Sequence, residues 1–197
     1  MFGRKGKSRD QTTIRIAVCG SWHHIGTTCL CIALSNYLCS RHRRKTAYVE
    51  MNAAGEILGI SDPHNGPFFQ KLGVHYYTQA SLPDLPLIES SGYDCLIIDF
   101  GVLNPRTLSA FIRCDRKLVI CDFSLWKRAK LEDFFRRNTF LFGSKGLTLL
   151  GNSRDFHLLA DAQDFSPAPV LFLPDIRNPF QITSDQFEIF EKILNGD

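Results

Sequence analysis

The segment IRIAVCGSWHHIGTTCLCIALSN, residues 14–36, decides the fold of this chain. It joins an apolar, strand-like run to a short turn, and the turn leads into a helix that opens at Gly26, Thr27 and Thr28. In a phosphate-binding loop of this layout, backbone N–H groups and the helix N-terminus hold the phosphates, a lysine contacts the terminal phosphates, and a Ser or Thr hydroxyl holds magnesium. Thr28 supplies the hydroxyl, but the loop contains no lysine. The sequence therefore predicts the frame of a phosphate-binding loop without its usual positive charge.

The length and composition indicate one domain. The chain has 197 residues, which is enough to bury a sizeable core. Residues 1–11 are basic and polar and are expected to form a flexible leader, whereas residues 12–197 are expected to form a single domain. No apolar run approaches the ~18 residues of a membrane span, and no apolar segment follows the basic start. Neither a transmembrane segment nor a signal peptide is therefore expected.

The cysteines and the charge indicate a cytoplasmic protein. Its 7 cysteines form an odd set without a CxxC pair. Cys29 and Cys31 stand two apart on a predicted helix, so their side chains point roughly 200° apart and cannot share a metal. Reduced, mostly buried thiols are expected. The net charge of +3 is too small to indicate nucleic-acid binding by itself.

Apolar runs alternate with helical patterns along the rest of the chain. Strands are predicted at residues 14–20, 46–51, 74–79, 94–101, 117–122, 147–152 and 170–174. Helices are predicted at residues 27–41, 105–114, 125–142, 155–160 and 184–194. Residues 52–93 hold so much proline and glycine that they are expected to be largely irregular. Because the strands are almost continuously apolar, the pattern predicts a doubly wound, mostly parallel α/β sheet with helices on both faces, in three layers.

Two of the helices carry clear packing signals. The helix at residues 27–41 has a stripe that should pack on the sheet, made of Leu30, Ala33, Leu34, Tyr37 and Leu38. The final helix is preceded by Thr183 and Gln186 in capping-box spacing. It is expected to bury Phe187, Phe190 and Leu194.

The loop resembles the deviant Walker A motif of the MinD/ParA family, a SIMIBI-class group of P-loop NTPases. The pattern of that family is Lys-Gly-Gly-x-Gly-Lys-Thr-Thr/Ser, and residues 22–29 read WHHIGTTC. Trp22 stands where the family has its signature lysine, and Thr27 stands where it has the P-loop lysine. Two histidines replace the first two glycines. Only Gly26 and Thr28 match at positions that carry chemistry.

The resemblance also implies roles for residues that follow two later strands. Asp99 matches the Walker B aspartate, which orients magnesium-bound water, and Gly101 lies where the family approaches the terminal phosphate. Thr28 and Asp99 are thus the implied magnesium site. Glu50 and Asn52 occupy the place of the acidic pair that positions the attacking water, although an asparagine cannot act as a base. Structural alternatives remain open, because a strand-terminal aspartate can also cap the next turn and Glu50 and Asn52 can shape a loop.

The resemblance implies that the ligand is Mg-ATP or ADP. If the side chains of the loop fill the phosphate site, no cofactor is expected. The implied contacts from the loop are His24, Ile25, Gly26, Thr27, Thr28 and Cys29. Asp175 and Arg177 follow the last strand, in the region that contacts the nucleotide base in the resembled family.

The two histidines of the loop permit opposite readings. When protonated, His23 and His24 could bind a phosphate in place of the missing lysine. A positive helix end disfavours imidazolium, however, and side chains with a Cβ restrict the backbone angles that glycines allow. In the alternative, Trp22, His23 and His24 fill the loop.

The partner class is less well defined. The predicted helix at residues 125–142 is basic and amphipathic, and such a helix can bind anionic lipid or DNA phosphates. The same pattern also arises when the apolar stripe faces the core and the charged residues face solvent. The C-terminal segment FEIFEKILNGD is mixed in charge, unlike the basic membrane-targeting tail of MinD proteins. Neither membrane targeting through that tail nor nucleic-acid binding is expected. A protein partner or a homodimer is expected instead.

The sequence thus predicts a divergent MinD/ParA-like domain with a degenerate P-loop. It resembles the TadZ/CpaE type, whose members are associated with pilus assembly and secretion machinery. One hypothesis is a nucleotide-binding switch or localisation factor with weak or no ATP hydrolysis, since both motif lysines are absent. A second is a pseudo-ATPase scaffold that acts through protein contacts alone. A third is a competent ATPase that takes its lysine from a dimer partner or another segment.

Overall fold

The sheet is the centre of the molecule and positions every candidate site residue. The computed structural model describes residues 12–52, 55–60, 66–151, 168–173 and 175–195. Within these ranges the strands form one sheet in the order β3-β4-β2-β5-β1-β6-β7-β8. Their bounds are β1 Ile14–Gly20, β2 Thr46–Glu50, β3 Phe69–Lys71, β4 Val74–Tyr77, β5 Cys95–Val102, β6 Arg116–Cys121, β7 Leu147–Gly151 and β8 Val170–Phe172. All neighbouring pairs are parallel except β3 and β4, which form an antiparallel edge.

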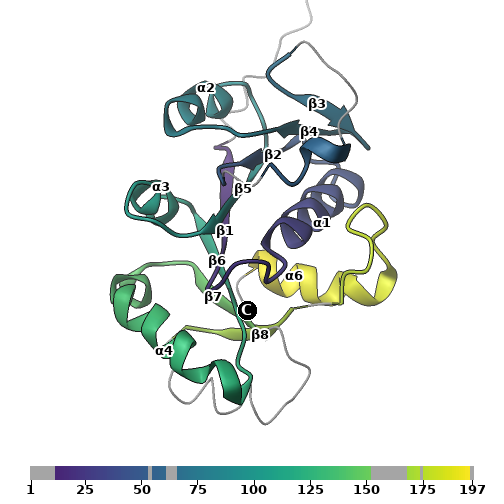
Figure 1. Ribbon diagram of the computed structural model, residues 1–197. Coiled ribbons are helices and arrows are strands. Elements are labelled where there is room, and N and C mark those ends of the chain that lie inside the picture. Colours follow the sequence, from purple (N-terminus) through teal and green to yellow (C-terminus); the bar gives the residue numbers. More distant parts are fainter. Residues whose placement is uncertain (1–11, 53–54, 61–65, 152–167, 174, 196–197) are drawn as a thin grey trace, which may run out of the picture.

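Helices cover both faces of this sheet (Figure 1). The α-helices are α1 Thr27–Ser40, α2 Leu85–Glu89, α3 Leu108–Ile112, α4 Arg128–Arg137 and α6 Phe187–Asn195. Single turns of 3₁₀ helix lie at Leu58–Ile60, Leu82–Asp84, Leu125–Lys127, Thr139–Gly143 and Ser184–Gln186. Helices α1 and α6 lie on one face, and α2, α3 and α4 lie on the other. The predicted three-layer, doubly wound α/β fold is confirmed.

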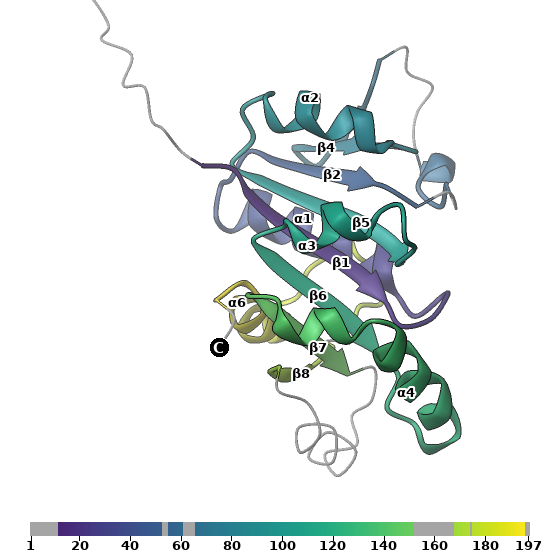
Figure 2. The same cartoon turned by 90° about the vertical axis from the view of Figure 1, so that its left-hand side faces the viewer.

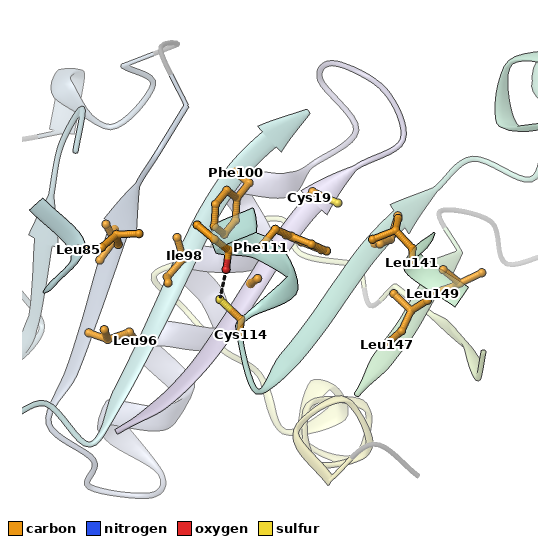
Figure 3. Packing of buried hydrophobic residues seen from close by; sticks show 14 of the residues in the cluster. Cys19, Leu85, Leu96, Ile98, Phe100, Phe111, Cys114, Leu141, Leu147 and Leu149 are labelled. Carbon is orange, nitrogen blue, oxygen red and sulfur yellow. Dashed lines mark hydrogen bonds between the residues drawn. The ribbon is translucent and has the colours of Figure 1, made fainter. Parts of the chain in front are cut away.

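Each face has its own apolar layer, because inward and outward side chains alternate along every strand. Residues such as Leu96, Ile98 and Leu149 pack under α2, α3 and α4 (Figure 3). In the same layer Cys114 donates a hydrogen bond to the Ala110 carbonyl at 3.4 Å. The opposite layer holds the neighbouring strand residues together with α1 and α6. The 7 cysteines are all free, in agreement with the expected reduced thiols.

Helix α1 is buried more completely than its stripe predicts. The five stripe residues are buried, but so are Cys31, Ile32, Ser35 and Asn36 on the other side. The reason is a cover formed by the C-terminal part of the chain. Asn36 donates to the Pro179 carbonyl at 3.2 Å, and Phe187 and Phe190 of α6 pack against the neighbouring Tyr37. Helix α1 is therefore a central element rather than a surface helix.

The structure corrects the prediction for residues 52–93. The described part of this stretch contains the β3–β4 hairpin and α2. The strand predicted at residues 74–79 is β4, and it ends at Tyr77. Strand β3 is only 3 residues long and exposes two of them, so it leaves no apolar pattern. Helix α2 contains Pro86 in its first turn, where proline is tolerated.

The helix predicted at residues 125–142 is interrupted. It consists of a 3₁₀ turn, α4 and a second 3₁₀ turn. Asn138 leaves the helical conformation with φ −123° and ψ 35°, and its side chain caps the Phe134 carbonyl at 2.8 Å. Leu131 and Phe134 are buried in the core. The apolar stripe therefore faces inward, as in the structural alternative for this basic segment.

The C-terminal helix begins as its capping box predicts. The Thr183 and Gln186 side chains bond reciprocally to the backbone of this turn. The buried residues of α6 are Phe190 and Ile193, whereas Phe187 is only partly buried. The predicted Leu194 is also only partly buried, because the helix is rotated relative to the predicted stripe.

Some predicted features lie outside the described residues. They are the leader at residues 1–11, the helix at residues 155–160, and the ends of the strands predicted at 147–152 and 170–174. Among the described helices, none has both the length and the apolar character that crossing a bilayer requires.

The position of α6 gives a test of this fold. Phe190 is 0% exposed and its ring lies 5.1 Å from that of Tyr37 on α1. We expect Phe190→Ala to lower the free energy of unfolding by about 3–5 kcal/mol, because a large cavity would form between the two helices. Urea unfolding followed by circular dichroism measures the loss. The control is Trp126→Ala, where the side chain is 82% exposed and the expected change is within ~0.5 kcal/mol. Equal losses for both variants would mean that α6 does not pack on α1 as described.

Candidate functional site

The candidate site lies where three parallel strands end. In Figure 2 the arrowheads of β1, β2 and β5 point to the same edge of the sheet, and the loop after β1 lies at that edge. Strand β1 is paired with β5 on one side and β6 on the other. Its loop leads to α1 on one face of the sheet, whereas β5 leads to α3 on the other face. Ligands of doubly wound sheets bind at such a switch point.

The loop has the backbone of a strand-to-helix turn. Gly26 immediately precedes α1 with φ 100°, in the left-handed region that glycine adopts at little cost. His24 also has a positive φ, of 57°. Histidine is one of the few residues enriched among non-glycine residues in this region. A histidine at position 24 is therefore compatible with the backbone that the loop adopts.

The Thr28 hydroxyl and the Asp99 carboxylate are directly bonded. Thr28 Oγ1 donates to Asp99 Oδ2 at 2.7 Å. The Tyr48 hydroxyl donates to the same oxygen at 3.0 Å, and the Gly101 N–H donates to Oδ1 at 2.9 Å. The last bond is the turn-capping role left open for a strand-terminal aspartate. The structure thus shows both the Thr28 contact and the cap.

Asp99 has no positive partner within the described part of the chain. Its side chain is 0% exposed, and burial raises the pKa of the carboxyl group. The hydrogen bonds from Thr28, Gly101 and Tyr48 oppose this effect by stabilising the charged form. A buried carboxylate held only by neutral donors is well suited to a nearby divalent cation, which would supply the missing charge.

Gly101 is tightly packed against Asn52. Its φ is 58°, and a Cβ at this position would lie 2.9 Å from the Cβ of Asn52. The Asn52 side chain also stabilises the charged form of Asp99 by hydrogen bonding. Asn52 and Gly101 therefore meet at the end of β5.

Glu50 lies behind the site rather than in it. It is 0% exposed, and its carboxylate accepts a hydrogen bond from the Gln79 N–H at 3.2 Å. Burial raises the pKa of the Glu50 carboxyl group, while the N–H groups of Gln79, Glu56 and Ile57 lower it. In this arrangement Glu50 joins two loops at the end of β2. The catalytic role implied for Glu50 stays a prediction.

A pocket of about 650 Å³ opens in front of the Thr28 hydroxyl. It is lined by Trp22, His23, His24, Gly26, Thr27, Thr28, Cys29, Met51, Asn52, Glu56, Phe100, Gly101, Val102 and Asn104. Of the contacts implied for the loop, Ile25 is different, because its side chain is buried in the core beneath the loop. No lysine or arginine is among the described residues that line this pocket.

The loop is not filled by its own side chains. The His24 side chain is 88% exposed, His23 is also exposed, and Trp22 is 43% exposed. Lys130 Nζ lies 4.0 Å from the centroid of the Trp22 ring, which stabilises the ring through a cation–π contact. The prediction that Trp22, His23 and His24 occupy the phosphate cradle therefore does not agree with this geometry.

Asp175 and Arg177 lie apart from the pocket. They line a separate cavity of about 460 Å³ near the start of α6. Ile176, which stands between them, lies next to helix α1. The Cys29 thiol of that helix donates to the Ile176 carbonyl oxygen at 3.6 Å. Thr28, Asp99 and Gly101 therefore lie together at the loop. Asp175 and Arg177 lie at the other cavity.

Sequence analysis missed Tyr48. It lies in the middle of β2 and is 0% exposed, and its hydroxyl contacts Asp99. The sequence of β2, TAYVE, places a tyrosine inside an apolar strand, and a buried tyrosine hydroxyl needs a hydrogen-bond partner. Which partner it would find depended on the register of β2 with β5, and the sequence alone does not fix that register.

Comparison with known proteins gives the fold. No protein-family model matches the chain, and no curated protein matches it in sequence. Among solved structures, the chain is similar to the septum site-determining protein MinD of Pyrococcus horikoshii OT3 complexed with Mg-ADP. The TM-score is 0.64 and the sequence identity is 17%, and the match covers 93% of this chain and 86% of the MinD chain. This chain is also similar to a ParA family ATPase from Chlorobium tepidum TLS, with a TM-score of 0.62 and 13% identity over 93% and 90% of the two chains.

A biosynthetic enzyme has a similar structure. The cobyrinic acid a,c-diamide synthase of Mycobacterium smegmatis, solved with bound ADP and magnesium, matches with a TM-score of 0.60 and 18% identity. That match covers 86% of this chain and 88% of the synthase chain. All of these identities are low, so they bear on the fold alone. The chain has the fold of the MinD and ParA ATPases, with a P-loop-like turn after its first strand.

Proposed function

We propose that this protein is a magnesium-nucleotide-binding switch with weak or no ATP hydrolysis. The observation that carries the proposal is the bond between Thr28 and Asp99 at the base of an open pocket. This bond leaves the lone pairs of the Thr28 oxygen directed away from Asp99, since the hydroxyl proton is used by the carboxylate. Thr28 would hold magnesium directly, and Asp99 would act through Thr28 and metal-bound water.

The residues present fit a magnesium-nucleotide complex. The pocket volume of about 650 Å³ lies within the usual range for small-molecule sites. Gly26 and Thr27 place backbone N–H groups at the start of α1, where an anion is favoured. Magnesium would supply positive charge between the phosphates and the buried Asp99. The mostly apolar side chains Met51, Phe100 and Val102 line another part of the pocket.

The same site explains why hydrolysis should be weak. A hydrogen bond to a charged group contributes about 1.5–3 kcal/mol, so the loss of the lysine weakens binding roughly ten- to over a hundredfold. Hydrolysis should suffer more, because catalysis depends on stabilising the charge of the phosphoryl transition state. Lys127 is the cation that follows β6, but it is paired with Asp122 at 2.6 Å. It does not line the pocket.

The partner is proposed to be protein, either a second copy of this chain or a component of pilus or secretion machinery in the cytoplasm. Support comes from the resemblance to the TadZ/CpaE type and from the mixed charge of the C-terminal segment. Affinity capture from the source organism after cross-linking tests this placement. Recovery of no pilus or secretion component would count against it.

A pseudo-ATPase scaffold is the second candidate function. It is favoured by one observation, the lack of lysine and arginine among the described residues of the pocket. Under this alternative the pocket would be a remnant and the protein would act through its surface alone. The two functions make opposite predictions for nucleotide binding.

Isothermal titration with Mg-ATP and Mg-ADP tests the first function. We expect saturable binding, and we expect Thr28→Ala to weaken it about tenfold or more, because the direct metal ligand is lost. The matched control is Ser35→Ala on the same helix, which removes a hydroxyl that donates to the Cys31 carbonyl at 2.7 Å. This control should bind like the wild type. The absence of heat with millimolar ligand would favour the scaffold.

Restoring the family lysine tests the reason for weak activity. Thr27 lines the pocket at the position of the missing lysine. We expect Thr27→Lys to tighten Mg-ATP binding about tenfold or more, through a charge-assisted contact with the phosphates. A steady-state phosphate-release assay should show faster hydrolysis as well.

The control for this gain is Thr27→Met, which adds a side chain of similar length without the charge. An equal gain in Thr27→Met would mean that packing, rather than charge, limits binding. No gain in either variant would show that the missing lysine is not what keeps the site weak.

A further inference from the structure

The pocket contains only two side chains that can become positive. Among the described residues that line it, these are His23 and His24, and the remaining lining residues are neutral or acidic. Both imidazoles are exposed rather than packed into the loop. Both rings are therefore accessible to a ligand in the pocket.

The two rings are arranged so that one anion can lie between them. Their centroids are 6.4 Å apart and their planes are inclined by 48°. Hydrogen bonds of about 2.8 Å from each ring to different oxygens of one phosphate would span such a gap. The positive φ of His24 contributes to this arrangement, because it turns the loop at that residue.

The charged groups around the rings come from several segments. Glu56 Oε1 lies 4.0 Å from His24 Nδ1, and the N-terminus of α1, which carries partial positive charge, begins three residues after His24. Lys130 is held over the Trp22 ring, and Asp99 is buried behind Thr28. A bound phosphate would place negative charge next to both rings, and negative charge favours the charged form of an imidazole.

We propose that His23 and His24 take the place of the missing lysine as phosphate-binding residues, so that nucleotide binding strengthens as the pH falls. The inference rests on the proposed function, since it concerns the same pocket. Only a protonated imidazole carries a positive charge and donates from both nitrogens. Nucleotide binding is therefore coupled to proton uptake by the protein.

The test compares Mg-ATP binding by isothermal titration at about pH 6 and about pH 8, on either side of the range where imidazoles change charge. The variant is His23→Gln with His24→Asn, because asparagine also tolerates a positive φ. The control is His42→Gln, which removes a histidine paired with Glu191 far from the pocket. ATP itself also titrates in this range, so each variant is compared with the wild type at the same pH.

We expect the wild type and His42→Gln to bind at least about fivefold more tightly at the lower pH than the double variant does. At the higher pH the three proteins should differ by less than about twofold, since neutral imidazoles give little attraction. Titration in buffers of different ionisation enthalpy should show extra proton uptake by the wild type relative to the double variant. Thermal unfolding of each variant checks that the fold is retained.

Two results would overturn the inference in different ways. If the double variant binds as tightly as the wild type at both pH values, the histidines do not bind phosphate, while the proposed nucleotide switch stands. If the wild type binds no nucleotide at either pH, the proposed function fails and this inference fails with it.

Discussion

The buried Asp99 carboxylate is the constraint on which the rest of the site depends. A buried charge without a positive partner is costly unless hydrogen bonds satisfy it. Thr28 from α1, Tyr48 from β2 and the Gly101 N–H at the end of β5 provide those bonds. Because these donors come from three elements, the β2–β5–β1 register must be kept for Asp99 to be satisfied. The interior of the sheet and the Thr28 side of the pocket are thus stabilised by one set of contacts.

This network does not need a positive charge in the loop. The contacts of Asp99 are neutral and internal, so none of them depends on a charge at position 22 or 27. The side of the pocket formed by the loop has no such support. Among the described residues, the N-terminus of α1 and the exposed imidazoles are the groups there that would attract an anion. The two sides of the pocket therefore differ in what holds them in place.

The sequence predicted most of the fold because the long apolar strands leave strong patterns. The resemblance to MinD/ParA motifs, rather than those patterns, indicated Thr28 and Asp99, and the structure brings the two side chains into contact. It missed the β3–β4 hairpin, since β3 has 3 residues and exposes two. It also missed Tyr48, whose partner depends on strand register. The outward direction of His24 and the separation of Asp175 from the pocket result from loop packing between distant segments. Local patterns carry no information about such contacts.

The fold alone does not choose between a switch and a scaffold. Similar structures include MinD complexed with Mg-ADP and a cobyrinic acid a,c-diamide synthase, and one fold can serve many functions. The pocket of this chain has no lysine or arginine among its described lining residues. A scaffold that no longer binds nucleotide would still use the Thr28–Asp99 bond to stabilise the sheet, but it has no physical need to keep an open pocket in front of that bond. The retention of Thr28, Asp99 and the open pocket together therefore favours a ligand whose negative charge is balanced by magnesium and, when protonated, by the loop histidines.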